Sequence, residues 1–419
     1  MRSSKGKIHL SIITVIICSF AFLVILHTDP SKDSYPRTKY VRKQSKYATA
    51  EEKPAKDHLK SSGIDNRIKF NQKVWRVDIG KWVFDHSFNP LYTERSCPYL
   101  ERQVTCIKNG RQDSDYLRWE WRPDDCALPR FNANLALEKL RGKRLMFVGD
   151  SLQRGQWRSF VCLVEWTIPE NKKSMKLGRP HSVFKATEYN ATIEFYWAPF
   201  LVESNADLNS RVDMKKRIMK LDSIAKHGKH WVGVDILVFN TYVWWMTGPR
   251  LKTLWGSFED GEVKYGGELD YLLAYRVGLE TWADWIDSNI DPSKTRVFFI
   301  TMSPTHQRSE DWGKINGTKC FNEKKPILKK THWGSGSDKR MMSVVASVGE
   351  KMRVPVTFIN ITQLSEYRID AHTSIYTETR GNLLTEEQKA DPLHHADCVH
   401  WCLPGLPDTW NQIFLTYLL

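Results

Sequence analysis

The sequence contains only one long apolar run, no internal repeat and no periodic spacing of its 23 glycines and 18 prolines. A multi-span membrane protein, a solenoid and a collagen-like chain are therefore excluded. Charged residues make up 26% of the chain and aromatic residues 12%, which also excludes an intrinsically disordered protein. With 419 residues, the chain can form a sizeable hydrophobic core.

Acidic residues are outnumbered, with 48 Asp and Glu against 62 Lys and Arg, so the net charge is +14. Residues 1–26 carry three of these positive charges and residues 27–73 an excess of six, which leaves an excess of five over residues 74–419. Such a mild excess on a large surface is not the basic stripe that binds a polyanion. We therefore expect no nucleic-acid partner.

The single apolar run covers residues 8–26 and has only four polar members. A helix of this length matches a hydrocarbon core of about 30 Å. No small-residue cleavage site follows the run, so we expect an uncleaved signal anchor that crosses the membrane once. Three basic residues precede it, which predicts a cytosolic tail at residues 1–7 and a lumenal position for the rest of the chain.

Cysteines and glycosylation sequons also indicate a lumenal body. Seven widely spaced cysteines follow the apolar run, and such cysteines are typical of disulfides in an oxidising compartment, although an odd number leaves one thiol without an internal partner. Sequons for glycosylation occur at Asn190, Asn316 and Asn360. Residues 27–73 are polar and predict a flexible stem, so we expect the folded lumenal domain at residues 74–419.

Short runs rich in Val, Ile and Phe alternate with amphipathic stretches in this domain. Strand followed by helix, repeated, predicts an α/β fold with a mostly parallel sheet and helices on both faces. Residues 74–130 are dense in Trp and Cys and depart from this rhythm, which predicts a smaller appended lobe. The expected strands are 144–148, 234–239, 296–301 and 354–359, and the expected helices are 132–141, 152–165, 211–226, 268–289 and 339–352.

Gly149, Asp150 and Ser151 follow the first expected strand and precede an expected helix. Sites form at the carboxyl ends of parallel strands, and a serine there presents its Oγ beside the amides of a helix N-terminus. This setting is typical of a nucleophile. The same residues also fit a tight turn in which Ser151 only caps the helix. These residues alone therefore do not distinguish a nucleophile from a capping serine.

Asp397 and His400 lie three residues apart near the C-terminus. A carboxylate in this position can accept the Nδ1 proton of the histidine and leave Nε2 facing a nucleophile. With Ser151, these residues make a candidate Ser-His-Asp triad. The surrounding Trp and Pro also fit a structural loop, and the two residues with His394 and His395 also fit a metal site. Because nearby cysteines are better suited to disulfides than to ligation in an oxidising lumen, we expect no metal.

Two further residues are candidates for stabilising negative charge. Asn240 ends the second expected strand, where its amide could join the Ser151 backbone N–H in binding an oxyanion. Arg154 lies one helical turn past Ser151 and could neutralise the same charge. Asn is also a common turn former, and Arg is common on exposed helix faces, so structural interpretations stay open for both residues.

Five motifs, taken together, resemble one known family. They are Gly149-Asp-Ser151, Asn109-Gly-Arg111, Trp197-Ala-Pro-Phe200, Leu364-Ser-Glu-Tyr-Arg368 and Asp397-Cys-Val-His-Trp-Cys-Leu-Pro-Gly405. In their order along the chain, these motifs look like those of the plant trichome birefringence-like proteins over about residues 75–415. The resemblance implies a three-layer SGNH/GDSL-hydrolase-like sandwich, a single-pass type II position in the Golgi membrane, and O-acetylation of a cell-wall polysaccharide. Phe195–Glu203 and Asn240–Trp245 look most like the xylan acetyltransferase branch.

The resemblance also assigns residues. It implies a catalytic triad of Ser151, Asp397 and His400, with Gly149, Asp150, Asn240 and Arg154 around the oxyanion or substrate. The family usually has Cys-Asp shortly before the Gly-x-Trp-Val stretch, where this chain has Trp75-Arg76, so one familiar disulfide must be missing. The pairs implied by motif position are Cys97–Cys162, Cys106–Cys402 and Cys320–Cys398, with Cys126 free.

The implied reaction is transfer of an acetyl group through an acetyl-serine to a hydroxyl of xylan. It needs an acetyl donor, either acetyl-CoA or an unidentified lumenal acetyl carrier, and no bound cofactor. Three alternatives remain: a lumenal acetyl esterase with the same triad, a transferase for mannan, xyloglucan or pectin, and a non-catalytic glycan-binding protein. Aromatic faces next to the motifs would line an acceptor groove, and we expect them from Trp244, Trp245, Trp401 and Trp410.

Overall fold

The computed structural model describes residues 77–419 except 208–211, 256–263, 316 and 380. The predicted tail at 1–7, anchor at 8–26 and stem at 27–73 lie outside the described residues. No helix within the described part of the chain has the length and apolar character needed to cross a membrane.

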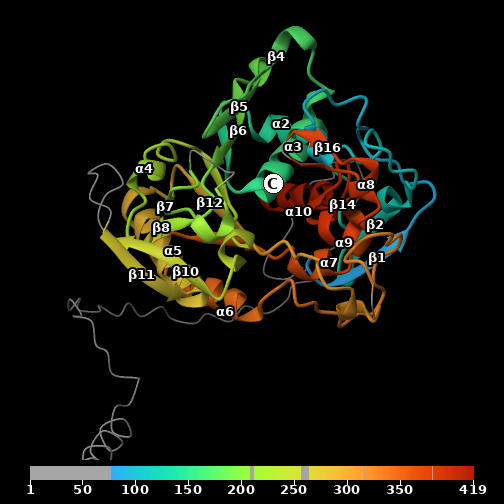
Figure 1. Ribbon diagram of the computed structural model, residues 1–419. Helices are drawn as coiled ribbons and strands as arrows, with labels where there is room; N and C mark the ends of the chain where they lie inside the picture. The colour runs from blue at the N-terminus through green and yellow to red at the C-terminus, as the bar shows by residue number, and fades with distance from the viewer. Residues whose placement is uncertain (1–76, 208–211, 256–263, 316, 380) are drawn as a thin grey trace, which may run out of the picture. The chain divides into compact units, whose positions relative to one another are not determined.

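Seven strands form the central sheet, in the order β13-β12-β9-β3-β6-β5-β4. The five strands from β13 to β6 are parallel, and β5 and β4 extend the sheet in antiparallel pairing (Figure 1). The expectation of a mostly parallel sheet is thus confirmed. The strands are β3 (Arg144–Gly149), β4 (Lys173–Lys176), β5 (His181–Ala186), β6 (Ala191–Trp197), β9 (Ile236–Phe239), β12 (Arg296–Ile300) and β13 (Val356–Ile359).

The four strands expected from apolar runs are β3, β9, β12 and β13, which lie side by side. β6 was not expected, because polar residues interrupt its pattern. One of them, Glu194, is buried and accepts hydrogen bonds from Arg144 at 2.8 Å and from His181 at 2.6 Å. Burial opposes its charge, but these two partners together lower the pKa of Glu194 to about 2. A strand with a paired buried carboxylate does not show as an apolar run.

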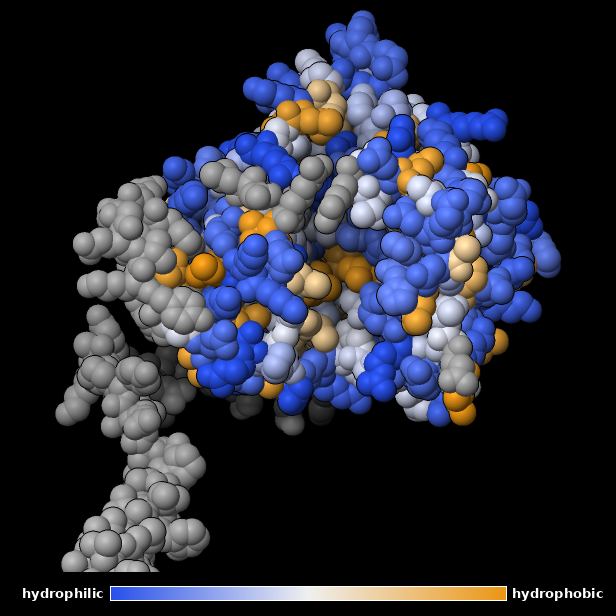
Figure 2. Space-filling view, viewed as in Figure 1, coloured by the Kyte–Doolittle hydropathy of each residue, from blue (hydrophilic) through white to orange (hydrophobic). Residues whose placement is uncertain are grey.

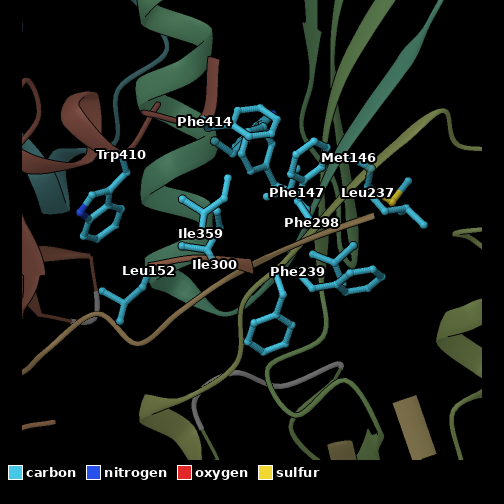
Figure 3. Packing of buried hydrophobic residues seen from close by; sticks show 14 of the residues in the cluster. Met146, Phe147, Leu152, Leu237, Phe239, Phe298, Ile300, Ile359, Trp410 and Phe414 are labelled. Carbon is cyan, nitrogen blue, oxygen red and sulfur yellow. The ribbon is translucent and has the colours of Figure 1, made fainter. Parts of the chain in front are cut away.

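Helices cover both faces of the sheet. On one face, Phe147 and Phe298 pack against Phe414, with ring centroids 5.9 and 5.2 Å apart (Figure 3). On the other face, Phe239 and Phe299 pack against Trp282 at 5.4 and 5.3 Å. These opposite contacts make the three layers of the expected sandwich. The first face carries α3 (Ser151–Glu165), α10 (Leu406–Leu418) and, beside α3, α2 (Ala133–Lys139); the second carries α5 (Tyr271–Asn289) with α6 (Lys339–Gly349) beside it.

One expected helix is wrong. In place of a helix at 211–226, the chain makes a single 3-10 turn at Met214–Lys216, then β8 (Ile218–Lys220) and the short α4 (Ala225–Gly228). Asp213 caps the turn through Lys215, and β8 pairs with β10 (Arg250–Trp255), which is distant in sequence. A non-local partner therefore overrides the local pattern. β10 also pairs with β11 (Lys264–Asp270), and β8 with β7 (Glu203–Ser204), giving a second, four-stranded sheet.

The Trp- and Cys-rich N-terminal segment shares the core of the body. Its strands β1 (Gly80–Phe84) and β2 (Trp119–Pro123) pair with each other, and Trp82 donates a hydrogen bond to the Leu364 carbonyl at 2.8 Å. Two disulfides join this segment to the body. The pairs present are those that the resemblance implied, namely Cys97–Cys162, Cys106–Cys402 and Cys320–Cys398, with Cys126 free.

The remaining elements are short and lie near the C-terminus. They include two small antiparallel pairs, β14 with β17 and β15 with β16. The bounds are α7 (Thr362–Glu366), β14 (His372–Ser374), β15 (Glu378–Thr379), β16 (Asn382–Leu383), α8 (Glu386–Lys389), α9 (Pro392–His395) and β17 (Asp397–Trp401).

The surface is mainly hydrophilic on the face shown in Figure 2, with hydrophobic residues in small separate spots and in a central hollow. Two of the sequon residues lie among the described residues. Asn190 is exposed in the turn before β6, whereas Asn360 is half-buried and donates its amide to Asp78 at 2.9 Å. A glycan on Asn360 would replace one of the two hydrogens of this half-buried amide. Asn316 lies outside the described residues.

Candidate active site

Ser151 is the first residue of α3 and stands directly after β3. Asp150 caps this helix by accepting the Leu152 N–H at 2.8 Å. Gly149 is needed in the turn because a Cβ there would lie 2.3 Å from the Asn240 carbonyl oxygen. The first N–H groups of a helix have no partner within the helix, and the helix dipole favours negative charge there. Ser151 therefore lies where an oxyanion can be stabilised.

Three side chains form a continuous hydrogen-bonded chain. Ser151 Oγ lies 2.7 Å from His400 Nε2, and His400 Nδ1 lies 2.7 Å from Asp397 Oδ2. The side chains of His400 and Asp397 are 19% and 18% exposed, so the chain of bonds is sheltered but not sealed from solvent. The structure thus brings together the three residues that the sequence pointed to, in the geometry of a nucleophile, a base and an orienting carboxylate.

The charge state of this chain follows from Asp397. Burial opposes its charge, but the bonds from the His400 ring and from the backbone N–H groups of His400 and Val399 hold the pKa of Asp397 well below its usual value. Burial also opposes the cationic form of His400, yet the adjacent carboxylate outweighs it and raises the pKa of His400. His400 therefore holds a proton taken from Ser151 more tightly than a free imidazole would.

His400 lies on β17, which is fixed on both sides. Cys398 is bonded to Cys320 and Cys402 to Cys106, so a disulfide precedes His400 by two residues and another follows it by two. β17 also pairs with β14. These constraints hold the short strand against the end of α3.

His372 on β14 supports the same strand. Its Nδ1 lies 3.0 Å from the His400 carbonyl oxygen, its Nε2 lies 2.6 Å from His306 Nδ1, and its ring stacks on Trp401 at 3.7 Å. Burial lowers the pKa of His372 well below its usual value, so the ring is neutral and carries one proton. A carbonyl only accepts, which places that proton on Nδ1, where it is donated to the His400 carbonyl.

The Trp- and Cys-rich N-terminal segment, here the N-terminal lobe, places side chains near the triad that the sequence did not predict. Gln103 Nε2 lies 3.2 Å from His400 Nδ1, and Gln103 Oε1 accepts from Arg154 at 3.3 Å. Glu101 pairs with Arg154 at 3.2 Å and with Arg158 at 2.7 Å. No local motif marks these residues, because they reach the triad only through the tertiary fold.

Three residues that were predicted near the oxyanion or substrate, Asn240, Asp150 and Arg154, have other contacts. Asn240 donates its amide to the carbonyl oxygens of Ile300 and Thr301 at 3.1 and 3.0 Å, which occupies both amide hydrogens and gives no support to an oxyanion role. Asp150 is fully buried, and burial raises its pKa to about 6. Arg154 lies on the same side of α3 as Ser151, but its guanidinium is already paired with Glu101.

The expectation that four tryptophans line an acceptor groove is wrong. All four side chains are at most 7% exposed, and three of them use their ring N–H internally, on Thr241, Ser303 and Ser365. In the core, the apolar ring is buried and the ring N–H finds a hydrogen-bond acceptor. The four are Trp244, Trp245, Trp401 and Trp410.

The residues of the alternative metal site do not converge. His394 is 71% exposed and bonds to Asp391, whereas His400 faces Ser151. In the part of the chain that the structure describes, no three His, Cys, Asp or Glu side chains are grouped as ligands of one ion.

Comparison with known proteins places this geometry in a family. Residues 128–417 match the PC-Esterase family, described as a GDSL/SGNH-like acyl-esterase family found in Pmr5 and Cas1p, and residues 77–127 match the PMR5 N-terminal domain. The chain is 59% identical to protein trichome birefringence-like 3 of Arabidopsis thaliana, over 98% of this chain and 97% of that protein. It is 49% identical to probable xylan O-acetyltransferase 8 of Oryza sativa subsp. japonica, over 100% of this chain and 99% of that protein. It is also 52% identical to xylan O-acetyltransferase 6 of the same rice, over 80% of this chain and 60% of that protein. The chain therefore belongs to the PC-esterase family, among the trichome birefringence-like proteins.

Proposed function

We propose that the protein is an O-acetyltransferase that acetylates hydroxyl groups of a plant cell-wall polysaccharide, and that its acceptor is xylan. The observation that carries this proposal is the chain of two 2.7 Å contacts from Ser151 through His400 to Asp397. Relatives that match nearly the whole chain include a probable xylan O-acetyltransferase at 49% identity, which supports the choice of acceptor.

The first half-reaction acetylates the enzyme. His400 Nε2 takes the proton of Ser151 Oγ as the oxygen attacks the carbonyl carbon of the acetyl donor. The Ser151 backbone N–H at the start of α3 helps to hold the negative oxygen. The bond between the acetyl carbon and the leaving group then breaks, and the His400 proton passes to the leaving group. The products are acetyl-Ser151 and the free carrier.

The second half-reaction uses the same base. His400 takes the proton of a sugar hydroxyl as its oxygen attacks the acetyl carbon, and the proton returns to Ser151 Oγ as the ester bond to the enzyme breaks. Water in place of the sugar would make the protein an acetyl esterase. The triad does not distinguish the two, so the difference depends on the surface that positions the acceptor.

The proposal includes a place in the cell. Residues 8–26 would anchor the chain in the Golgi membrane as a single-pass type II protein, with the catalytic domain in the lumen. Three disulfides in the domain support an oxidising compartment, and exposed Asn190 is placed to carry a glycan. A fusion to a fluorescent protein would test the Golgi position. An endoglycosidase digest would test whether the domain is glycosylated, as expected of a lumenal domain.

The test of function uses the full chain with acetyl-CoA and xylotetraose, followed by mass spectrometry. We expect xylotetraose that carries an added acetyl group and, when the acceptor is omitted, a Ser151 peptide that carries one. Release of acetate without any acetylated sugar would favour the esterase. Turnover without an acetyl-Ser151 peptide, even after rapid quench, would contradict the two-step route.

A further inference from the structure

A pocket of about 400 Å³ lies beside α3, the helix that begins at the candidate nucleophile. One wall is formed by Arg154 and Arg158 of α3 together with Glu101 of the N-terminal lobe, and another by Arg179 in the turn between β4 and β5. The lining also includes buried Phe195 and Trp197 of β6, and Leu177, Gly178, Pro180 and Ser182. The arginine side chains of this lining are suited to an anionic group.

The pocket carries an excess of positive charge. Arg154 and Arg158 share the single carboxylate of Glu101, and Arg179 also belongs to the lining. Arg158 is 5% exposed, and its Nε has no hydrogen-bond partner among the described residues. Burial of this cation lowers the pKa of Arg158, a cost that the Glu101 carboxylate only partly offsets. A buried cation with incomplete pairing is stabilised by an added anion.

The pocket is adjacent to the reacting atoms. Positions 151, 154 and 158 follow the three- and four-residue spacing of one helix face. With a rise of 1.5 Å per residue, Arg154 lies about 5 Å and Arg158 about 10 Å from Ser151 along the axis. Gln103 accepts a hydrogen bond from Arg154 at 3.3 Å, and its amide nitrogen lies 3.2 Å from His400 Nδ1. A group held here is thus close enough to belong to a molecule that also reaches Ser151.

We propose that this pocket binds an anionic group, a phosphate or a carboxylate, carried by one of the two substrates. The identification of the ligand as a substrate rests on the proposed function. A chain of neutral pentoses offers no counter-charge to arginine, so the anion is either a phosphate of the donor or a carboxylate on an acidic side group of the polysaccharide. Guanidinium groups bind both through paired N–H donors.

Binding to the Ser151→Ala protein separates this proposal from catalysis, because no acetyl transfer can occur. The full chain is titrated calorimetrically with two pairs of probes matched except for the anionic group: phosphopantetheine against pantetheine, and glucuronosyl-xylotetraose against glucosyl-xylotetraose. We expect the charged member of at least one pair to bind roughly tenfold more tightly, as for a hydrogen bond to a charged group, with a preference that weakens as salt is added. Preference in the first pair identifies a donor phosphate, and preference in the second identifies an acceptor carboxylate.

Arg179→Glu, added to Ser151→Ala, tests the residues. Arg179 is exposed, so its replacement should leave thermal unfolding unchanged, and we expect the preference for the charged probe to be lost. The matched control is Lys185→Glu, which makes the same charge change at an exposed position of neighbouring β5 outside the pocket lining. Equal binding within both pairs would overturn the proposal, and so would an equal loss in the control. Failure of the proposed function would show separately, as absence of acetyl transfer by the unmutated chain.

Discussion

The Cys106–Cys402 disulfide should support both the fold and the position of the catalytic strand. It joins residues 296 positions apart in sequence, and Cys402 follows His400 by two residues. For a closed loop of this length, the chain-entropy model gives a stabilisation of about 6 kcal/mol at 25 °C. With an unfolding entropy of about 2 cal/mol/K per residue over the described domain, this loss corresponds to a fall in Tm of roughly 8 °C.

The test is the double variant Cys106→Ser/Cys402→Ser, which leaves neither partner of the bridge as an unpaired thiol. We expect the lowered Tm in thermal unfolding followed by circular dichroism, and a severe loss of acetyl transfer at temperatures where the variant is still folded. Cys97→Ser/Cys162→Ser is the matched control. It opens a separation of only 65 residues, worth about 4 kcal/mol in the same model, and neither cysteine adjoins β17, whereas Cys402 directly follows it. Full activity in the first variant, or equal loss of activity in both, would refute the reasoning.

Three further predictions concern the site. Ser151→Ala should abolish transfer, and adding His400→Ala should cost little more, since the residues act as one unit; near-normal transfer by folded Ser151→Ala would exclude it as nucleophile. Because His400 must be neutral to act as base and its pKa is raised, kcat should rise with pH through a value above 6.5. Asp397→Asn should lower kcat about 1,000-fold or more and move this limb to lower pH; an unmoved limb would show that another group sets the profile. In His372→Asn the amide stands near the position of Nδ1 and can donate to the His400 carbonyl, whereas in His372→Gln it stands near Nε2, so the Asn variant should keep more activity; equal kcat values would show that the ring only fills space.

The elements that could be predicted from the sequence are those whose signal is local. Strands β3, β9 and β12 are continuous apolar runs because both faces of a central parallel strand are buried. Ser151 and the pair Asp397 and His400 could be found because each sits in a short segment with a definite chemical pattern. Their pairing across 249 residues was an inference from that chemistry, and the contact between Ser151 and His400 agrees with it.

The features that could not be predicted depend on partners far away in the chain. Glu194 makes β6 look polar until Arg144 and His181 are placed beside it. β8 takes its conformation from β10 rather than from its own pattern. The tryptophans near the motifs were expected in a groove, but a large aromatic ring beside a site is as well suited to the core beneath it, and nothing in the local sequence distinguishes the two.

The site contains groups that react and groups that line the flanking pocket. The reacting groups come from α3 and β17. The flanking pocket shares α3 through Arg154 and Arg158, and adds Glu101 of the N-terminal lobe and Arg179 of the turn before β5. A change in these two segments can alter which molecule is held beside Ser151 without moving the triad. Preference among donors and acceptors should therefore vary with these segments, while the chemistry of acetyl transfer stays with the triad.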